Sequence, residues 1–470
     1  MLPLDALRSP DLPPAQLAGL FAAAGESLYL VGGSVRDALL GRGVDELDFD
    51  FATSARPDRI VEILKGWADS IYRVGEAFGT IGAMKDGRSV EITTFRSEVY
   101  RDESRKPQVT YSDDIETDLS RRDFTVNAIA VELPGFDPVD PFGGLDDLES
   151  KVLRTPLDPE ISFGDDPLRM LRLFRFQATL GFAADVEAIA AVQRMASRLQ
   201  IVSAERIRDE FSKLMLAEAP GAALAMIVAT GLSTYFLPEL DRLAMAQDPE
   251  QRHKDVLAHT LAVVDRTQPD LVLRLAALFH DIGKPDTREF GPNGVTFHHH
   301  EVVGARMTRE RLRELAYPKE VVDDVSRLVF LHLRPHTLKL GWTDSAVRRY
   351  VRDAGHLLDR LNALVRADVT TANEKRQRQI QAGIDELEDR IAVLSEQEEL
   401  ARLRAPIDGH DVMGYLGIPP GPMVGEIMDI LLEKRIDEGP YTRREAFELV
   451  RQWAGSRGLD DPGPPPDEEE

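Results

Sequence analysis

The sequence of 470 residues contains no cysteine. Disulfides, thiolate nucleophiles, cysteine-ligated zinc and iron–sulfur clusters are therefore excluded together. Any metal ion that this chain binds must be held by histidine, aspartate or glutamate.

The chain also lacks a long apolar run. No stretch approaches the roughly 18 consecutive apolar residues of a membrane helix, and the amino terminus has no basic segment followed by an apolar stretch and a cleavage site. We therefore expect a cytoplasmic protein with no membrane contact. Hydrophobic residues make up 43% and charged residues 29% of the chain, which is ordinary for a globular protein and excludes collagen-like and mostly disordered chains. This length suggests about three domains.

Basic residues are outnumbered. The chain has 57 Lys and Arg against 81 Asp and Glu, a net charge of −24. A field of that sign repels nucleic acid at long range, so an RNA partner would need a locally basic surface. The best candidate is the segment 168–213, which has eight basic and five acidic residues, 8 − 5 = +3.

The spacing of apolar residues changes along the chain. Short β-rich runs (28–31, 49–52, 89–94 and 126–131) alternate with helical patterns, which predicts a mixed α/β domain. After Pro167 the spacing is helical throughout, and apolar residues between Ile380 and Leu394 step by four and three, as in an amphipathic helix. We therefore expect an α/β head followed by all-α segments. The boundaries are 1–26 (helical extension), 27–150 (head), 151–250 (helical), 251–375 (histidine-rich), 376–456 (helical) and 457–470 (disordered acidic tail).

A glycine turn and paired aspartates lie in the head. Gly32-Gly33 follows a predicted strand and precedes a short helix, where free N–H groups favour an anion. Asp48 and Asp50 are i and i+2 of a strand, so their carboxylates share one face. Oxygen ligands of this kind suit Mg²⁺ in phosphoryl transfer, and Glu91 on a later strand could add a third carboxylate. The alternatives are an ordinary turn, an exposed acidic strand face and a solvated Glu91.

Two further motifs carry arginine. In the first, Arg121 and Arg122 could bind triphosphate oxygens, or could simply form a surface ion pair with Asp118. In the second, Pro167 begins a helix on which Asp166 and Arg169 are neighbours. A carboxylate beside a guanidinium can match the edge of a base, although an acidic N-cap paired with arginine is also commonplace.

Together these motifs resemble one family. Gly32-Gly33-Ser34-Val35-Arg36-Asp37, Asp48-Phe49-Asp50, Arg121 to Ala128 and Asp165-Asp166-Pro167-Leu168-Arg169 resemble, in that order, the class II CCA-adding tRNA nucleotidyltransferases, whose head is shared with bacterial poly(A) polymerases.

The resemblance implies a polymerase-beta-like mixed sheet in the head, tRNA as partner, and CTP and ATP as substrates. It makes Asp48 and Asp50 the catalytic residues that hold Mg²⁺, and it makes Asp166 with Arg169 a template for the base. The implied nucleotide-binding residues are Gly32, Gly33, Arg36, Arg121, Asp123, Asn127, Asp166, Arg169 and Arg172. The family usually has Glu where Asp165 stands, which leaves the role of Asp165 open. The segment 96–111, with Arg101, Arg105, Lys106 and Pro107, resembles the family's mobile loop, and 203–207 is similar to its neck helix.

Nine of the ten histidines lie in the block 253–373. The run Leu278 to Lys284, with His280-Asp281, and the later run Phe297 to Glu301 resemble an HD-domain metal site. The resemblance implies His259, His280, Asp281 and Asp368 as ligands, with His300 and His332 as additional candidates. Imidazole and carboxylate together suit Mn²⁺, Ni²⁺ or Zn²⁺. The alternative is a helical body with satisfied core histidines.

The leading hypothesis is therefore a tRNA nucleotidyltransferase that adds CCA to tRNA 3′ ends and releases diphosphate. A poly(A) polymerase has the same head and is the close alternative. An HD-type metal phosphohydrolase with a nucleotide-recruiting head, and a non-catalytic RNA-binding protein, are hypotheses of other classes.

Overall fold

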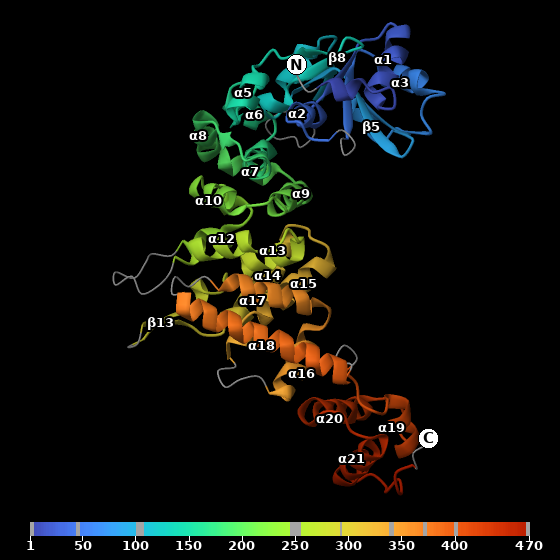
Figure 1. The fold of residues 1–470 in the computed structure, drawn as a ribbon, viewed down its shortest axis with the longest axis vertical. Coiled ribbons are helices and arrows are strands. Elements are labelled where there is room, and N and C mark those ends of the chain that lie inside the picture. Colours follow the sequence, from blue (N-terminus) through green and yellow to red (C-terminus); the bar gives the residue numbers. More distant parts are fainter. Residues whose placement is uncertain are drawn as a thin grey trace. The chain divides into compact units, whose positions relative to one another are not determined.

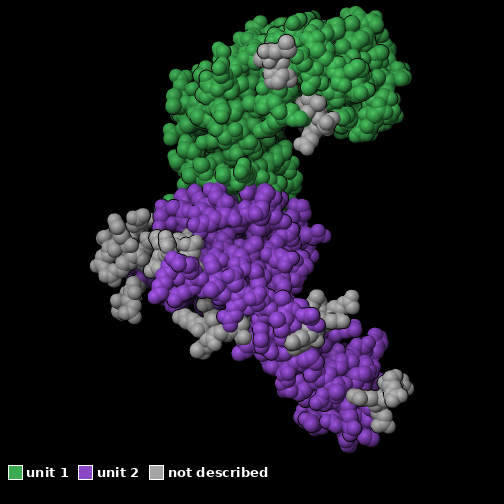
Figure 2. All heavy atoms as spheres, in the orientation of Figure 1, with its two compact units in different colours: residues 1–244, 314–317 green, residues 245–313, 318–470 purple. Residues whose placement is uncertain are grey.

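The computed structural model describes residues 4–43, 48–99, 108–244, 255–291, 294–337, 343–369, 374–398 and 403–466. The chain divides into two compact units (Figure 2). Unit 1 is Met1–Ala244 with Glu314–Tyr317, and unit 2 is Met245–Arg313 with Pro318–Glu470. Each unit is described by itself.

Unit 1 begins with a seven-stranded mixed sheet in the order β3-β4-β5-β2-β1-β8-β9 (Figure 1). β2 and β5 pair in parallel and the other neighbours pair antiparallel. A separate two-stranded sheet is formed by β6 and β7. The strands are β1 Leu28–Val31, β2 Phe49–Thr53, β3 Ser70–Tyr72, β4 Thr80–Lys85, β5 Arg88–Thr94, β6 Arg96–Val99, β7 Gln108–Tyr111, β8 Ala130–Leu133 and β9 Asp137–Val139.

Alternating burial explains why β2 forms where it does. Phe49 and Phe51 are each only 1% exposed, whereas Asp50 between them faces solvent. One face of the strand therefore contributes aromatic side chains to the core, and the other presents carboxylate. This is the period of two that the sequence predicts.

Some helices of unit 1 come before or between the strands of the sheet in the chain, and the others follow its last strand (Figure 1). α7 begins after Pro167, as predicted, and buries Leu171, Leu173 and Phe174. The helices are α1 Pro13–Ala23, α2 Gly33–Leu39, α3 Pro57–Leu64, α4 Ile115–Ser120, α5 Gly144–Ser150, α6 Pro159–Asp165, α7 Leu168–Leu180, α8 Val186–Met195, α9 Ala204–Met215, α10 Gly221–Ala229 and α11 Pro238–Leu243.

Unit 2 is mainly helical. The predicted amphipathic helix is α18, which buries Ile384, Leu387 and Leu394. The helices are α12 Val256–Arg266, α13 Leu271–Phe279, α14 His300–Glu314, α15 Lys319–Leu331, α16 Asp344–Ala354, α17 Leu358–Asp368, α18 Glu374–Glu398, α19 Gly409–Leu416, α20 Pro422–Glu438 and α21 Arg443–Ser456. Within the described ranges, no helix has the length and apolar character needed to cross a membrane.

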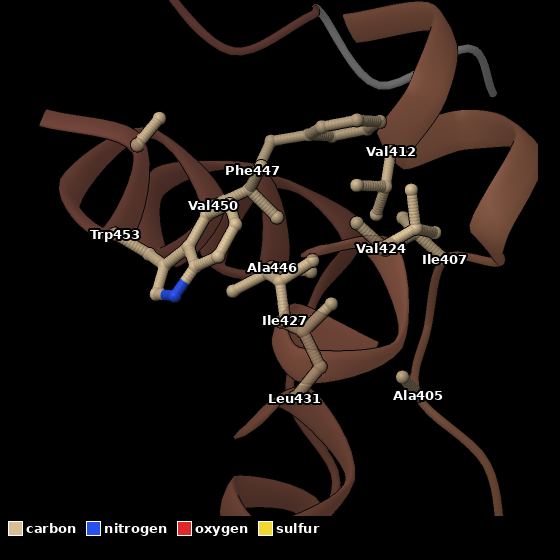
Figure 3. Packing of buried hydrophobic residues seen from close by; sticks show 11 residues of the cluster. Ala405, Ile407, Val412, Val424, Ile427, Leu431, Ala446, Phe447, Val450 and Trp453 are labelled. Carbon is tan, nitrogen blue, oxygen red and sulfur yellow. The ribbon is translucent and has the colours of Figure 1, made fainter. Parts of the chain in front are cut away.

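The last three helices enclose a small core of their own. Val412, Ile427, Val450 and Trp453 pack together between α19, α20 and α21 (Figure 3). The segment after α21 is not the free tail that its composition suggests. Leu459 packs against this core, the Tyr415 hydroxyl donates to the Gly463 carbonyl at 2.7 Å, and Arg451 pairs with Asp461 at 2.7 Å. An apolar contact, a hydrogen bond and an ion pair thus hold residues 459–463 despite the acidic sequence.

Two other expectations about secondary structure were wrong. The chain after Pro167 is not entirely helical, because β11 (Ala183–Ala184) pairs with β10 (Val152–Leu153), and β12 (Arg288–Gly291) pairs with β13 (Gly294–Phe297). Glycines at 291 and 294 between β-favouring runs were the sequence signal for the second pair. In the head, Thr125–Asn127 forms a 3-10 turn and the strand starts only at Ala130. The predicted loop residues Arg101, Arg105, Lys106 and Pro107 lie outside the described residues.

Candidate active site and metal centre

The carboxylates of the head line one side of β2 and β5. Asp50 lies opposite Glu91 in the parallel pairing of these strands, and Asp48 directly precedes β2. All three residues are exposed. Asp48 and Asp50 are therefore not buried, and both carboxylates are accessible from solvent.

Gly32 borders this acidic side. It has φ +78°, in the region that favours glycine, and follows β1, whose Val31 is paired with Asp50. A Cβ at Gly32 would lie 3.1 Å from Arg122 Nη1 and 3.6 Å from Asp50 Oδ2. The glycine thus leaves room beside the carboxylate and brings the Arg122 guanidinium close to it. Arg122 belongs to the predicted motif, but its position beside Asp50 could not be predicted from the sequence.

The charges around Asp50 are unbalanced. Neighbouring protein atoms reduce the hydration of its carboxyl and raise its pKa to about 6; Arg122 opposes this shift, while Glu91 and Asp48 add to it. Carboxylates that repel each other in this way are stabilised by a divalent cation. The donor set of three exposed carboxylates with no imidazole fits a hard ion such as Mg²⁺.

Arg121 and Arg122 both bind the carboxylate of Asp118. Arg121 Nη2 lies 2.7 Å and Arg122 Nη2 lies 3.2 Å from its oxygens. Asp118 is fully buried, and although burial disfavours its charge, the two guanidinium groups lower its pKa. The sequence left open a surface ion pair of little value here. The structure shows instead a buried anchor that orients both arginines.

A chain of hydrogen bonds links the glycine turn to α7. Arg36 Nη1 donates to Asn127 Oδ1 at 2.7 Å, and Asn127 Nδ2 donates to Asp123 Oδ1 at 2.9 Å. The other oxygen of Asp123 accepts from Arg172 Nε at 2.9 Å and from Nη2 at 2.6 Å. Four of the predicted nucleotide-binding residues therefore lie in one connected network. Asp123 is its centre.

Asp123 is ionised within this network. Burial alone would raise its pKa, but Arg172 and the amide of Asn127, with smaller effects of Arg169 and the Phe124 N–H, lower it to about 2. Both of its oxygens are already used by protein donors. The geometry makes Asp123 a residue that positions Asn127 and Arg172.

The predicted base-reading pair has partners of its own. Asp166 Oδ2 accepts from Arg206 Nη2 of α9 at 2.7 Å. Arg169 is 8% exposed, donates from Nη1 to the Ser162 carbonyl at 3.1 Å, and donates from Nη2 to the Arg121 carbonyl. The contact with Arg121 places α7 against the motif Arg121 to Ala128. Sequence reasoning missed the role of Arg206, because 40 residues separate it from Asp166.

The expected basic patch on segment 168–213 is not formed by its first three arginines. Arg169 is buried, and Arg172 and Arg175 form ion pairs with buried carboxylates. Glu210 of α9 is 5% exposed and lies 2.7 Å from Arg175 Nε and 3.7 Å from Arg172 Nη1. These contacts hold the first three arginines of the segment inside unit 1.

The histidine-rich block of unit 2 brings six potential ligands together. They form two groups, and in each group the ligand atoms lie within 4.8 Å of one another. The groups are His259, His280 and Asp368, and Asp281, His300 and His332. The four predicted ligands and the two additional candidates thus meet in one place. They come from the helices α12, α14 and α17 and from the ends of α13 and α15.

Opposite charges attract each other within this cluster. Burial disfavours a charged His280, but Asp281 and Asp368 raise its pKa to about 10. The same surroundings hold the pKa of Asp281 well below its usual value, since His280 and Lys284 outweigh the cost of burial. The carboxylates attract positive charge to the ring nitrogens. These residues fit a transition-metal ion, because they offer imidazole and carboxylate within one small volume.

Three parts of the chain match known protein families. Residues 28–154 match the poly A polymerase head domain, residues 181–243 match the family described as probable RNA and SrmB-binding site of polymerase A, and residues 250–373 match the HD domain. An A-adding tRNA nucleotidyltransferase of Deinococcus radiodurans is 33% identical over 95% of this chain and 98% of its own. A CC-adding tRNA nucleotidyltransferase of Thermus thermophilus is 31% identical, over 93% and 96%.

The chain belongs to the tRNA nucleotidyltransferase family. A CCA-adding enzyme of Anoxybacillus flavithermus is 31% identical over 92% of this chain and 93% of its own. Among solved structures, the Bacillus stearothermophilus CCA-adding enzyme in complex with CTP has a TM-score of 0.67 and 27% identity, over 95% of this chain and 99% of that one. The family resemblance and the predicted fold class, a mixed-sheet head followed by a largely helical remainder with an HD domain, are confirmed.

Proposed function

We propose that this member of the tRNA nucleotidyltransferase family adds C, C and A to the 3′ ends of tRNA, using CTP and ATP and releasing diphosphate. The observation that carries the proposal is the exposed group Asp48, Asp50 and Glu91, bordered by Gly32 and Arg122. Comparison with the CTP-bound relative supports this function over hydrolysis as the main reaction. A protein acting on tRNA would work in the cytoplasm.

Asp48 and Asp50 would hold Mg²⁺, and Glu91 faces the same side of the sheet. When bound there, Mg²⁺ would supply activation of a hydroxyl nucleophile and neutralisation of the leaving diphosphate. In the reaction, the tRNA 3′-oxygen forms a bond to the α-phosphorus, the bond to the β-phosphate bridging oxygen breaks, and the hydroxyl proton is released. Gly32 leaves the space into which the nucleotide phosphates would enter.

The nucleotide would be held along the network that joins the turn to α7. Arg121 and Arg122, fixed by Asp118, would face the triphosphate, and Gly32-Gly33 would let it approach the backbone. Arg36 and Asp123 would hold Asn127 in place toward the ribose. We assign a positioning role to Asp123 and a binding role to Asn127 because of their hydrogen bonds. Both oxygens of Asp123 already accept from protein donors, whereas Asn127 is held in place by Arg36 and Asp123.

Asp166 and Arg169 would select the base, and Arg172 would support them from the same face of α7. A carboxylate accepts from an exocyclic amine, which both cytosine and adenine carry, and a guanidinium donates to ring acceptors. Arg206 holds the Asp166 carboxylate at the start of α7. The selection of C and A over U and G would rest on the position of that amine, at C4 of cytosine and C6 of adenine, where uracil and guanine carry a carbonyl oxygen.

The relatives divide into A-adding, CC-adding and CCA-adding enzymes, so the decisive assay must separate these activities. The purified chain is incubated with Mg²⁺ and with tRNA ending either before CCA or after CC, in the presence of CTP, ATP or both. Addition of two C to the first substrate with CTP, and of one A to the second with ATP, followed by a stop, supports the proposal. Addition of only one of the two nucleotides, or continued A addition without use of CTP, would contradict it.

A variant pair tests the site in the same assay. Asp50→Asn should reduce both additions by at least about 10³-fold, because it removes a charge proposed to hold the ion. Asp58→Asn is the matched control, since Asp58 is an exposed carboxylate of the head paired with Arg73 at 3.1 Å. Asp281→Ala in unit 2 should leave nucleotide addition intact. An equal loss of nucleotide addition in Asp50→Asn and Asp58→Asn would show that the acidic side of the sheet has no specific part in the reaction.

A further inference from the structure

Unit 2 contains a cavity whose residues belong to neither site described above. It has a volume of about 640 Å³ and lies between α14, α15 and the 3-10 turn Gly355–Leu357 that follows α16. Small-molecule sites in proteins occupy roughly 300–1,000 Å³, so a ligand of that size fits. The residues that line the cavity are all different from those of the histidine and aspartate cluster.

The cavity and the histidine cluster use opposite faces of the same two helices. Because an α-helix turns by about 100° per residue, Arg306 and Arg309 lie roughly 120–180° around α14 from His300. By the same rotation Phe330 lies roughly 160° around α15 from His332, which directly follows the last residue of that helix. A ligand in the cavity would therefore be separated from the cluster by the helices themselves.

Two arginines of α14 offer guanidinium groups to the cavity. Arg306 is exposed and, within the described part of the chain, has no ion-pair or hydrogen-bond partner. Arg309 has one carboxylate neighbour, Asp323 at 3.8 Å, which is too far for a hydrogen bond. Guanidinium groups with unused donors are suited to a phosphate, which accepts two parallel hydrogen bonds from each of them.

The carboxylates around the cavity do not cancel these charges. Asp353 lies 3.0 Å from Arg352 Nη2 and 3.4 Å from Arg334 Nη2, and Asp324 lies 2.9 Å from His356 Nε2. With Arg334 and Arg352 included, five arginines stand against the three lining aspartates, 5 − 3 = +2. The cavity is therefore locally positive in a chain whose net charge is −24.

The remaining wall is apolar and includes an aromatic ring. Phe330 is partly buried, and the guanidinium carbon of Arg327 lies 5.8 Å from the centre of its ring. Arg327 donates to the Asp353 carbonyl from Nε at 3.1 Å and from Nη2 at 2.9 Å, so its plane is held in place. Val302 adds an apolar side chain that is 48% exposed. Nucleobases stack on aromatic rings and on arginine planes of this kind.

We propose that this cavity binds a free nucleoside phosphate, with its base against Phe330 and Arg327 and its phosphate on Arg306 and Arg309. The phosphate accounts for the unused guanidinium donors, and the base accounts for the ring beside an apolar wall. An enclosed volume of this size favours a small ligand over a polynucleotide. The proposal concerns unit 2 alone and does not depend on the nucleotide addition assigned to unit 1.

The test uses the full-length chain in EDTA, so that no metal ion contributes, with 8-azidoadenosine monophosphate as the photoaffinity probe. Peptide mapping after irradiation should find saturable labelling in peptides of α14 and α15, and unlabelled AMP should prevent it. Adenosine and inorganic phosphate should each compete at least about 10-fold less well than AMP, because each makes only part of the contacts.

Single substitutions separate the two parts of the site. Arg306→Glu should reduce labelling of these peptides at least about 10-fold, because it replaces an unpaired positive charge by a negative one. Phe330→Leu should reduce it at least about 5-fold, and Phe330→Tyr, which keeps the ring, should retain it. Arg313→Glu is the matched control, because Arg313 is an exposed arginine of α14 that does not line the cavity. It should change labelling less than about 2-fold, since solvent and salt screen its charge.

Three results would overturn the proposal. They are labelling confined to peptides of unit 1, equal labelling in Arg306→Glu and Arg313→Glu, and displacement of the probe by tRNA but not by AMP. If Phe330→Leu does not fold, Arg306→Glu decides the question, because an exposed side chain can be replaced there without loss of a protein contact.

Discussion

The ion pair between Asp123 and Arg172 makes the head and α7 energetically dependent on each other. Arg172 donates to Asp123 from two nitrogens, at 2.9 and 2.6 Å, and the Asp123 carboxylate is 8% exposed. Replacing Arg172 by Met keeps the length of the side chain but leaves this carboxylate without its main counter-charge. Removing one partner of a buried pair is strongly destabilising, because the remaining charge stays desolvated.

The magnitude can be worked from the pKa of Asp123. A fall from 3.8 to about 2 on folding corresponds to ~2.4 kcal/mol of stability at neutral pH. Asn127, Arg169 and the Phe124 N–H contribute part of it, and the desolvated carboxylate adds a cost, so we expect Arg172→Met to destabilise α7 by about 2–3 kcal/mol. Because the folded pKa is depressed, this contribution is present above about pH 4 and is lost as the pH falls through about 2.

Hydrogen exchange measured by mass spectrometry suits this test, because a chain with two compact units does not unfold in two states. Peptides from α7 should lose protection by about 30–150-fold in Arg172→Met, while peptides from α13 stay unchanged. Arg194→Met is the control: Arg194 forms an exposed pair with Glu160 at 2.6 Å, and its loss should cost less than about 1 kcal/mol. In the Asp123→Asn background the Arg172→Met penalty should fall by at least about 1 kcal/mol. An undiminished penalty there, or one no larger than that of Arg194→Met, would refute the reasoning.

Three other outcomes follow from the head and α7. The pKa of Asp50 is raised from 3.8 to about 6 on folding, so ionisation of this carboxyl destabilises the metal-free protein above about pH 6. Asp50→Asn should therefore raise the free energy of unfolding of the metal-free protein at pH 8 by about 1 kcal/mol, after allowing for the exposure of the side chain. This gain should vanish as the pH falls from 6 to 4. Gly32→Ala should reduce nucleotide addition at least about 10-fold, because the new Cβ would lie 3.1 Å from Arg122 Nη1 at a residue with a left-handed backbone. Unchanged kcat and KM would contradict this. Arg206→Ala should lower the preference for CTP over UTP by about 10-fold or more, since it removes the side chain that holds the Asp166 carboxylate. The ratio of C to U incorporation, measured in both proteins, checks this.

The sequence predicted residues better than it predicted contacts. The run Glu46 to Phe51 places Asp50 between two core phenylalanines through period-two alternation alone, and the structure has this arrangement. Alternation is a local property, so it is visible in a single strand. The pairing of Asp50 with Glu91 depends on which strands become neighbours, and the sequence offered Glu91 only as one of two interpretations.

The arginines of α7 show the opposite case. A count of charges along the chain predicts a positive surface for RNA at Arg169, Arg172 and Arg175. In the structure they face Ser162, Asp123 and Glu210, which lie between 7 and 49 positions away in the chain. A charge count treats each residue as solvated, whereas an ion pair with a buried carboxylate, such as Asp123 or Glu210, neutralises the arginine. These three arginines therefore do not form the basic surface for tRNA that their number predicts.

The histidines show the same limit only in part, because His332 was predicted as an additional candidate ligand but its place in the cluster was not. Neighbouring residues such as His280 and Asp281 can be recognised as a motif, but His332 stands 52 residues after His280 and carries no local signature. Its Nε2 is placed against that of His300 by the carbonyl of Val329 and by the approach of Gly283 to α14. These are backbone effects, which composition and spacing do not record. The grouping of the six potential ligands is consequently a property of how the helix ends meet.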